Sequence, residues 1–267
     1  MSGSARRVWG LVYRHLALYR RSWPRMLELA YWPTLQLCIW GFTSSFLISR
    51  GVGGGGTLLA AGALIGGVLL WEVTVRSQMG VSITFLEEIW SRNLGHVFVS
   101  PVRPWEMVSA LFLMSLFRTI AGVAPAAVLA FVLYAFNILS IGPILVLFLL
   151  NLMVMGWSVA LAVVSLLLRY GAGAEALAWS LLFGLAPLSA VFYPVAALPA
   201  VLRPIARALP SAHVFEGMRA ALGGVVRWDE LGWAVGLNIV WAAAAVLIFA
   251  WQFQVARRDG ALVSVGE

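Results

Sequence analysis

The 267-residue chain contains no lysine, and all 18 of its basic residues are arginine. A phosphate-binding loop of the G-x-x-x-x-G-K-[ST] type needs a lysine, so we expect no ATP hydrolysis through such a loop on this chain. The single cysteine, Cys38, excludes an internal disulfide and a cysteine-based metal cluster. The motifs H-E-x-x-H and G-x-S-x-G are also missing, which counts against a membrane protease or hydrolase. We therefore expect no catalytic residue, no metal site and no resident cofactor.

Charged residues are scarce too: they make up 11% of the chain, whereas 62% of it is hydrophobic and the mean hydropathy is +0.93. Soluble domains carry about 25% charged residues. The composition therefore predicts an all-α polytopic membrane protein. The net charge of +7 comes from arginines at the ends of apolar runs, a pattern typical of membrane topology. We expect no nucleic-acid partner.

Apolar runs occur in lengths that suit a membrane, since about 20 helical residues cross ~30 Å of hydrocarbon. We predict about six spans within a single transmembrane domain over residues 1–267. The spans are expected at residues 28–49, 57–80, 118–137, 143–168, 176–195 and 231–254. Pro187 and Pro194 interrupt the fifth span, so it is expected to be broken.

The first 25 residues predict a helix that lies along the membrane surface. One side carries an apolar stripe at helical spacing, and the other side carries arginines at every seventh position. The stripe consists of Val8, Leu11, Val12, Leu16 and Tyr19, and the arginines are Arg7, Arg14 and Arg21. The alternative is a basic flank that only sets orientation.

Arginines indicate the orientation of the spans. If the spans alternate, ten arginines lie on the side of both termini and five on the other side. The five are Arg50, Arg203, Arg207, Arg219 and Arg227. Because arginine is enriched in cytoplasmic loops, both termini are expected in the cytoplasm.

Two segments cannot be simple connections between spans. The polar stretch EEIWSRNLGHVFVSPVRPWE, residues 87–106, has an amphipathic pattern that predicts a cytoplasmic loop helix within residues 86–105. The alternative is a helix lying on the membrane surface. Residues 192–219 hold four prolines and cannot form an uninterrupted span. We predict short external helices over 196–228 that re-enter the outer leaflet before the last span.

The order Pro, Leu-Pro, then Leu-Pro-x-x-His-x-x-Glu-x-x-Arg in residues 192–219 resembles the signature before the last helix of ABC-2 type exporter permeases. Residues 86–105 resemble the coupling helix of the same family. The resemblance implies the membrane subunit of an ATP-driven exporter for an amphiphilic substrate: a glycan, a lipid-linked glycan or a drug-like molecule. It also implies a bacterial cytoplasmic membrane, a lipid environment and a separate ABC ATPase that holds ATP and Mg. The permease partner would be a second copy or a homologous permease.

Site residues follow from this resemblance. The residues expected to couple to the ATPase are Glu87, Glu88, Trp90 and Arg92. The aromatic residues expected along the pathway are Trp32, Trp40, Phe183, Phe192 and Tyr193, the last two as a gate. Aromatic rings suit stacking on sugars or apolar ligands, but any one of them could instead face lipid.

Charged residues within the apolar runs need partners. The i,i+4 spacing of Glu72 and Arg76 predicts an intrahelical pair, in preference to a proton relay. His213 and Glu216 share a helix face, which predicts a structural or gating hydrogen bond, since two ligands are too few for a metal site.

Two other functional classes remain open at the level of sequence. One is a polytopic lipid-modifying enzyme, although no cluster of acids or histidines marks one membrane face. The other is a membrane assembly subunit that transports nothing, and no residue pattern indicates it directly.

Overall fold

The computed structural model describes residues 3–50, 57–91 and 101–258, and within these ranges the chain is helical with no strand. The long helices are α1 (Gly3–Arg21), α2 (Trp23–Ser49), α3 (Thr57–Trp90), α5 (Pro104–Tyr134), α6 (Ile144–Tyr170) and α10 (Trp228–Arg258). The shorter helices are α7 (Glu175–Leu185), α8 (Arg203–Arg207) and α9 (Pro210–Leu222), with 3-10 turns η2 (Ile138–Ile141), η3 (Gly171–Ala174) and η4 (Val195–Ala197).

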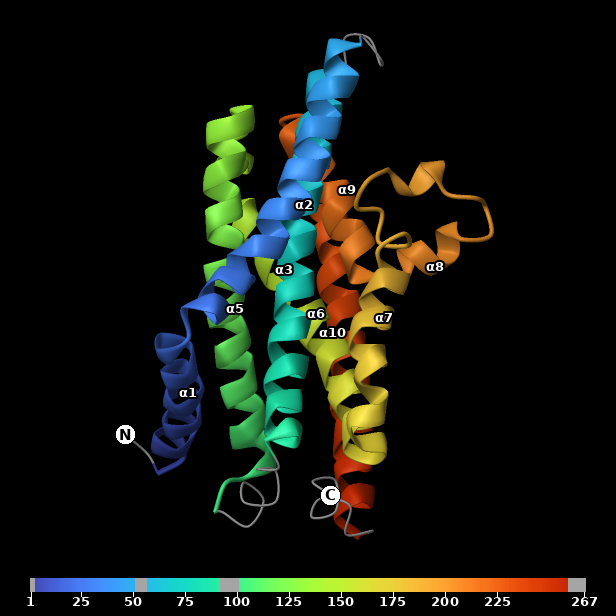
Figure 1. The fold of residues 1–267 in the computed structure, drawn as a ribbon. Coiled ribbons are helices and arrows are strands. Elements are labelled where there is room, and N and C mark those ends of the chain that lie inside the picture. Colours follow the sequence, from blue (N-terminus) through green and yellow to red (C-terminus); the bar gives the residue numbers. More distant parts are fainter. Residues whose placement is uncertain (1–2, 51–56, 92–100, 259–267) are drawn as a thin grey trace.

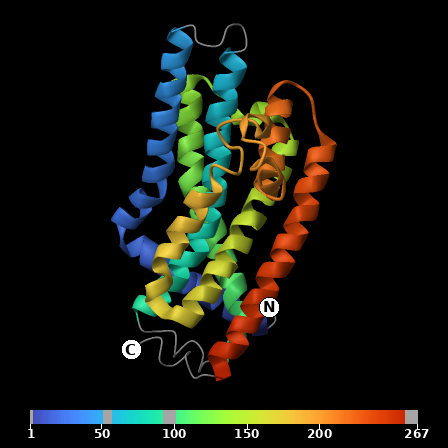
Figure 2. The ribbon, with the colours of Figure 1, turned by 90° about the vertical axis from the view of Figure 1, so that its right-hand side faces the viewer.

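The long helices form one elongated bundle in which α2, α3, α5, α6, α7 and α10 alternate in direction along the chain (Figure 1). Helix α3 is central and packs against α2, α5 and α6. Helix α1, the last turn of α3, the start of α5 and the end of α10 lie at the same end of the bundle, which we call the α1 end (Figures 1 and 2). Helix α9 and the start of α10 lie towards the opposite end.

Four helices of the described residues, α3, α5, α6 and α10, are long and apolar enough to cross a membrane. The chain is therefore an all-α polytopic membrane protein, as predicted. Helix α2 is long, but threonine, serine and glutamine lower its hydropathy, and α7 has only 11 residues. At 1.5 Å per residue α7 covers about 17 Å, short of ~30 Å of hydrocarbon. The total of six spans stays a prediction.

Small residues allow α3 to approach its neighbours closely. A Cβ atom added to Gly80 would lie 2.8 Å from the Cα atom of Ser115 in α5, and one added to Gly156 of α6 would overlap the Ser77 hydroxyl of α3. Contacts of this kind are typical of helix packing in membranes, where close approach strengthens van der Waals attraction. Large side chains, among them Phe85 of α3, fill the space around them.

Buried polar side chains tie the helices together. The Asn238 amide of α10 donates to the carbonyl oxygen of Asn151 in α6 at 3.0 Å, and the Gln78 amide of α3 donates to the carbonyl oxygen of Ala178 in α7 at 3.1 Å. Hydrogen bonds between membrane helices contribute about 0.6 kcal/mol on average. These bonds therefore fix the alignment of the helices more than they stabilise the fold.

Helix α1 (Gly3–Arg21) lies within the 25 residues predicted as the N-terminal helix, and protein covers part of its apolar stripe. Val12 and Tyr19 are buried against Ala110 and Met114 of α5. The aromatic Tyr13, on the other side of α1, is 66% exposed. The position of α1 along the membrane surface stays a prediction, because helical periodicity shows that a face is apolar but not whether protein or lipid covers it.

Candidate functional site

The last turn of α3 holds three of the four residues predicted to couple to an ATPase. Glu87, Glu88 and Trp90 continue the long helix α3 and do not begin a separate loop helix. The fourth residue, Arg92, and residues 93–100 of the expected loop segment lie outside the described residues, and its last two residues, Pro104 and Trp105, begin α5. The predicted loop helix was started at residue 86, inside α3, because the apolar stripe of residues 86–90 also fits the end of a spanning helix.

Ion pairs join this turn to the beginning of the chain. The Glu88 carboxylate pairs with the guanidinium of Arg14, and its Oε1 atom lies 3.3 Å from Nε2 of His15. The Glu87 carboxylate lies 3.7 Å from the guanidinium of Arg25 in α2. Glu88 is only 4% exposed and joins α1 to α3, so any part that it plays in coupling to an ATPase, which stays a prediction, is through this internal contact. Trp90 is 51% exposed and remains accessible.

A cavity of about 570 Å³ opens beside these ion pairs, between α1, the start of α2 and the end of α3. Its volume falls in the range of about 300–1,000 Å³ found for ligand pockets. The lining residues are Arg14, His15, Leu18, Arg25, Glu87, Glu88, Trp90 and Ser91. Both signs of charge meet here, so the cavity suits a polar partner.

His15 is buried in the wall of this cavity, as is Glu88. Desolvation by burial, together with the smaller effect of the nearby positive charges of Arg14 and Arg118, lowers the pKa of His15 from 6.5 to about 4. The imidazole is therefore neutral near pH 7. Its Nδ1 atom is buried and has no hydrogen-bond partner among the described residues.

A further ion pair at the α1 end was not predicted from the sequence. Arg7 of α1 donates through Nε and Nη2 to Glu106 of α5 at 2.9 and 2.6 Å. The same carboxylate accepts from the backbone N–H of Arg103 at 2.9 Å and closes a capping box at the start of α5. Arg7 and Arg14 are one heptad apart, and this spacing was the available signal that both reach acids on neighbouring helices.

The predicted pathway aromatics do not form one cluster. Phe192 follows the end of α7 and stacks on Trp40 of α2, with ring centroids 4.5 Å apart and 23° between the planes. The Tyr193 hydroxyl donates to the carbonyl oxygen of Pro187 at 2.7 Å. Trp32 and Phe183 are 49% and 71% exposed on the outside of the chain. The structure thus brings Trp40 and Phe192 together and leaves Trp32 and Phe183 apart from them.

The two predicted charge pairs differ in outcome. Arg76 Nε lies 3.3 Å from Glu72 Oε2, in the intrahelical pair that the spacing predicts. His213 does not pair with Glu216. Its Nδ1 lies 2.6 Å from Oε2 of Glu230, because the first turn of α10 packs beside α9.

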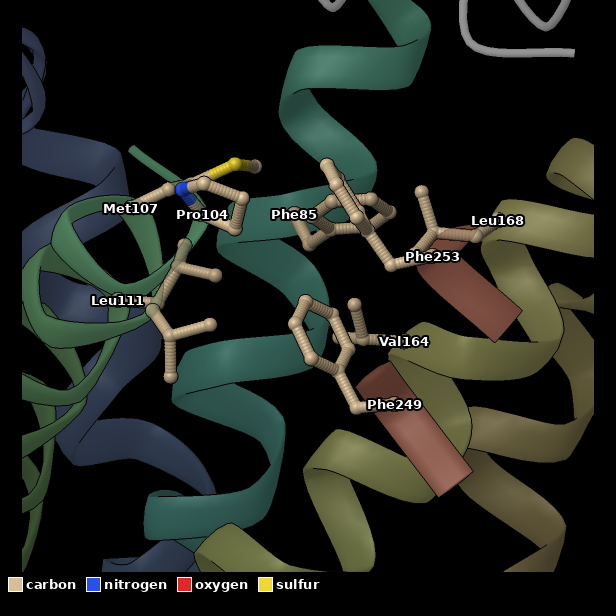
Figure 3. Close-up of a pocket in the computed structure, with 9 residues that line it drawn as sticks. Phe85, Pro104, Met107, Leu111, Val164, Leu168, Phe249 and Phe253 are labelled. Atoms are coloured by element: carbon tan, nitrogen blue, oxygen red, sulfur yellow. The ribbon is translucent and has the colours of Figure 1, made fainter. Parts of the chain in front are cut away.

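A small apolar pocket of about 10 Å³ lies between α3, α5, α6 and α10 (Figure 3). Phe85, Phe249 and Phe253 point into it together with aliphatic side chains. This volume holds at most about one water molecule, so the pocket is a packing defect and not a substrate site. Among the described residues no group of three or more His, Cys, Asp or Glu side chains could hold a metal ion.

The apolar helices that are long enough to span define a polytopic membrane protein. The family model for the ABC-2 type transporter matches residues 6–222, from α1 to the end of α9. The chain therefore belongs to the ABC-2 type transporter family, whose members are membrane components of ABC transporters, are generally not enzymes and generally work with an ABC ATPase. No curated protein matches the chain.

Proposed function

We propose that the chain is the permease subunit of an exporter that moves an amphiphilic substrate, of the glycan, lipid-linked glycan or drug-like class, out across a bacterial cytoplasmic membrane. A separate ABC ATPase binds ATP and Mg at the cytoplasmic face, and a second copy of the chain completes the pathway. The charged cavity at the α1 end, built on α3, is the single observation that carries the coupling part of this proposal. The excess of arginines in α1 and at the ends of α6 and α10 supports a cytoplasmic position for this end.

Coupling needs a rigid path from the ATPase to the spans. Helix α3 supplies one, because it runs unbroken from Thr57 to Trp90 and packs against three neighbouring helices. Its last turn is tied to α1 and α2 by Glu88 and Glu87. A movement applied at this turn therefore displaces three helices as one body. The exposed Trp90 and the cavity beside it form the surface on which the ATPase is proposed to dock.

Replacement of Trp90 by alanine tests the coupling proposal. The side chain is half exposed at the rim of the cavity, so its loss should leave the fold intact. We expect the variant to copurify with less ATPase and to lose substrate-stimulated hydrolysis. Trp105, which is 52% exposed at the start of α5 and lies outside the cavity, is the matched control. Normal complex yield and normal stimulated hydrolysis in Trp90→Ala would contradict the assignment.

The broken segment after α7 is proposed as the external gate. Pro187 follows the end of α7 at Leu185, and Phe192 bridges this segment to α2 by stacking on Trp40. We expect Phe192→Ala to open the stack and to raise basal ATPase activity of the complex without loss of assembly. The control is Phe131→Ala, because Phe131 is 59% exposed on α5. Unchanged basal hydrolysis would contradict the gate.

Orientation is testable with cysteines in a Cys38→Ala background. Ser91, directly after α3, and Val201, just before α8, are both exposed, whereas Ser211 is buried and bonded to Ser189 and would report poorly. An impermeant maleimide should label Val201→Cys from outside intact cells and Ser91→Cys only after the cytoplasmic side is opened. The reverse pattern would contradict both the orientation and the docking surface.

A further inference from the structure

Residues 186–194, between α7 and η4, are irregular backbone in the half of the bundle that contains α9 (Figure 2). Backbone of this kind is tolerated inside a membrane protein only where protein or water satisfies its N–H and C=O groups. The segment carries Phe192, the residue that stacks on Trp40.

Two side chains one turn apart on α9 reach the segment. The Glu216 carboxylate accepts from the backbone N–H of Val195 at 2.7 Å. The Arg219 guanidinium donates through Nη1 to the carbonyl oxygen of Ala190 at 2.9 Å. The two side chains also pair with each other, with Nη2 of Arg219 3.3 Å from Oε1 of Glu216. The backbone is therefore held at both ends of residues 190–195 by one ion pair.

The backbone of residues 190–195 is strained at Ala190. Ala190 has a φ of 56°, a left-handed conformation that costs about 1–2 kcal/mol for a residue with a Cβ atom. Such a conformation persists only where the surroundings enforce it. Ala190 and Val191 are 0% and 1% exposed, and the carbonyl oxygen of Val191 lies so close to α3 that a Cβ atom on Gly67 would be 2.6 Å from it. The segment is thus fixed between α9 and α3.

We propose that Glu216 and Arg219 act as positioning residues that hold residues 190–195 and thereby keep Phe192 stacked on Trp40. The consequence for gating rests on the proposed function, but the positioning does not. A purely local role in α9 would require only an i,i+3 pair on an exposed face, worth a few tenths of a kcal/mol. Here both side chains are mostly buried, at 23% and 18% exposure, and their partners are backbone groups 21 and 29 residues away.

The test uses Val191→Cys as a reporter in the Cys38→Ala background, with the purified permease in lipid nanodiscs. Val191 is buried, so its cysteine should react slowly with a thiol reagent. We expect Glu216→Ala and Arg219→Ala each to accelerate labelling at least about tenfold, which corresponds to about 1.4 kcal/mol in the opening equilibrium. Glu216→Gln keeps an oxygen acceptor for Val195 and should restore most of the protection.

Two controls separate local release from general unfolding. Arg203 also donates to loop carbonyls, those of Ala196 and Leu198, so Arg203→Ala removes a comparable bond at a different place and should leave Val191→Cys protected. A second reporter, Leu152→Cys, lies in the core of α6 at 0% exposure and should stay unreactive in all variants. A further variant, Gly67→Ala, should displace the same segment from α3 and accelerate labelling of Val191→Cys, while the ion pair of Glu216 and Arg219 stays intact.

Protected Val191→Cys in both alanine variants would overturn the positioning role. Equal acceleration at Leu152→Cys would also overturn it, because the pair would then support the whole fold. Faster labelling only at position 191, together with raised basal ATPase activity of the complex, supports both the positioning and the gate. Faster labelling without any change in hydrolysis upholds the positioning and counts against the gate alone.

Discussion

The ion pair between Glu88 and Arg14 should make a measurable contribution to the stability of the α1 end. The side chain of Glu88 is 5% exposed and that of Arg14 is 42% exposed. Breaking a fully buried pair costs about 3–5 kcal/mol, whereas an exposed pair contributes about 0–1 kcal/mol. Because solvent screens the arginine, we expect Glu88→Ala to lower the free energy of unfolding by about 1–2 kcal/mol.

The assay is thermal unfolding of the permease in lipid nanodiscs. A loss of 1 kcal/mol lowers the midpoint by about 2–4 °C in a chain of this size, so Glu88→Ala should lower it by roughly 2–8 °C. A double-mutant cycle with Arg14→Ala isolates the pair from the other contacts of Glu88. The coupling term should be at least about 0.5 kcal/mol, since the two residues are in contact.

Glu175→Ala is the matched control. Glu175 begins α7 at the same end of the bundle and forms no ion pair within the described residues, so its loss should change stability by less than about 0.5 kcal/mol. Additive effects of Arg14→Ala and Glu88→Ala would refute the reasoning, because they would show that the two charges do not interact. Equal losses of stability in Glu88→Ala and Glu175→Ala would show that the removal of any acidic side chain destabilises the protein, and not the loss of the ion pair between Glu88 and Arg14.

Three further predictions follow from buried groups. The folded pKa of His15 is about 4 and the unfolded value about 6.5, so the unfolded state binds more protons between these values. Stability should therefore be full above pH 6.5 and fall by up to about 2–3 kcal/mol as the pH drops to 4, and His15→Gln should flatten this dependence of the thermal midpoint. Asn238→Leu removes the bonds to Asn151 and should cost about 0.6–1.7 kcal/mol, whereas Leu247→Ala on the exposed side of α10 should change the midpoint little. Gly156→Ala should lower the free energy of unfolding by about 1–3 kcal/mol, because the added methyl group overpacks α3 against α6. The control is Gly184→Ala, which should be neutral or stabilising because nothing lies within 4 Å of the added atom. Equal thermal midpoints for the two variants would contradict the close packing.

Features that depend on neighbours along the chain were predictable. The pair of Glu72 and Arg76 follows from i,i+4 spacing, and the end of α7 at Leu185 follows from Pro187. The pairing of His213 was not predictable. Sequence spacing favours Glu216, but the fold of α10 beside α9 places Glu230 closer.

The sequence by itself determined the class of this protein: its scarcity of charge and its long apolar runs require membrane helices, and its prolines forbid a continuous helix over residues 192–219. The absence of lysine excluded a phosphate-binding loop. The tertiary structure alone decided which face of α1 is covered by protein, that Glu88 is an internal tie, and that Glu216 and Arg219 hold distant backbone. Periodicity and local spacing report which side chains share a face, whereas the partner of that face depends on contacts between segments far apart in the chain.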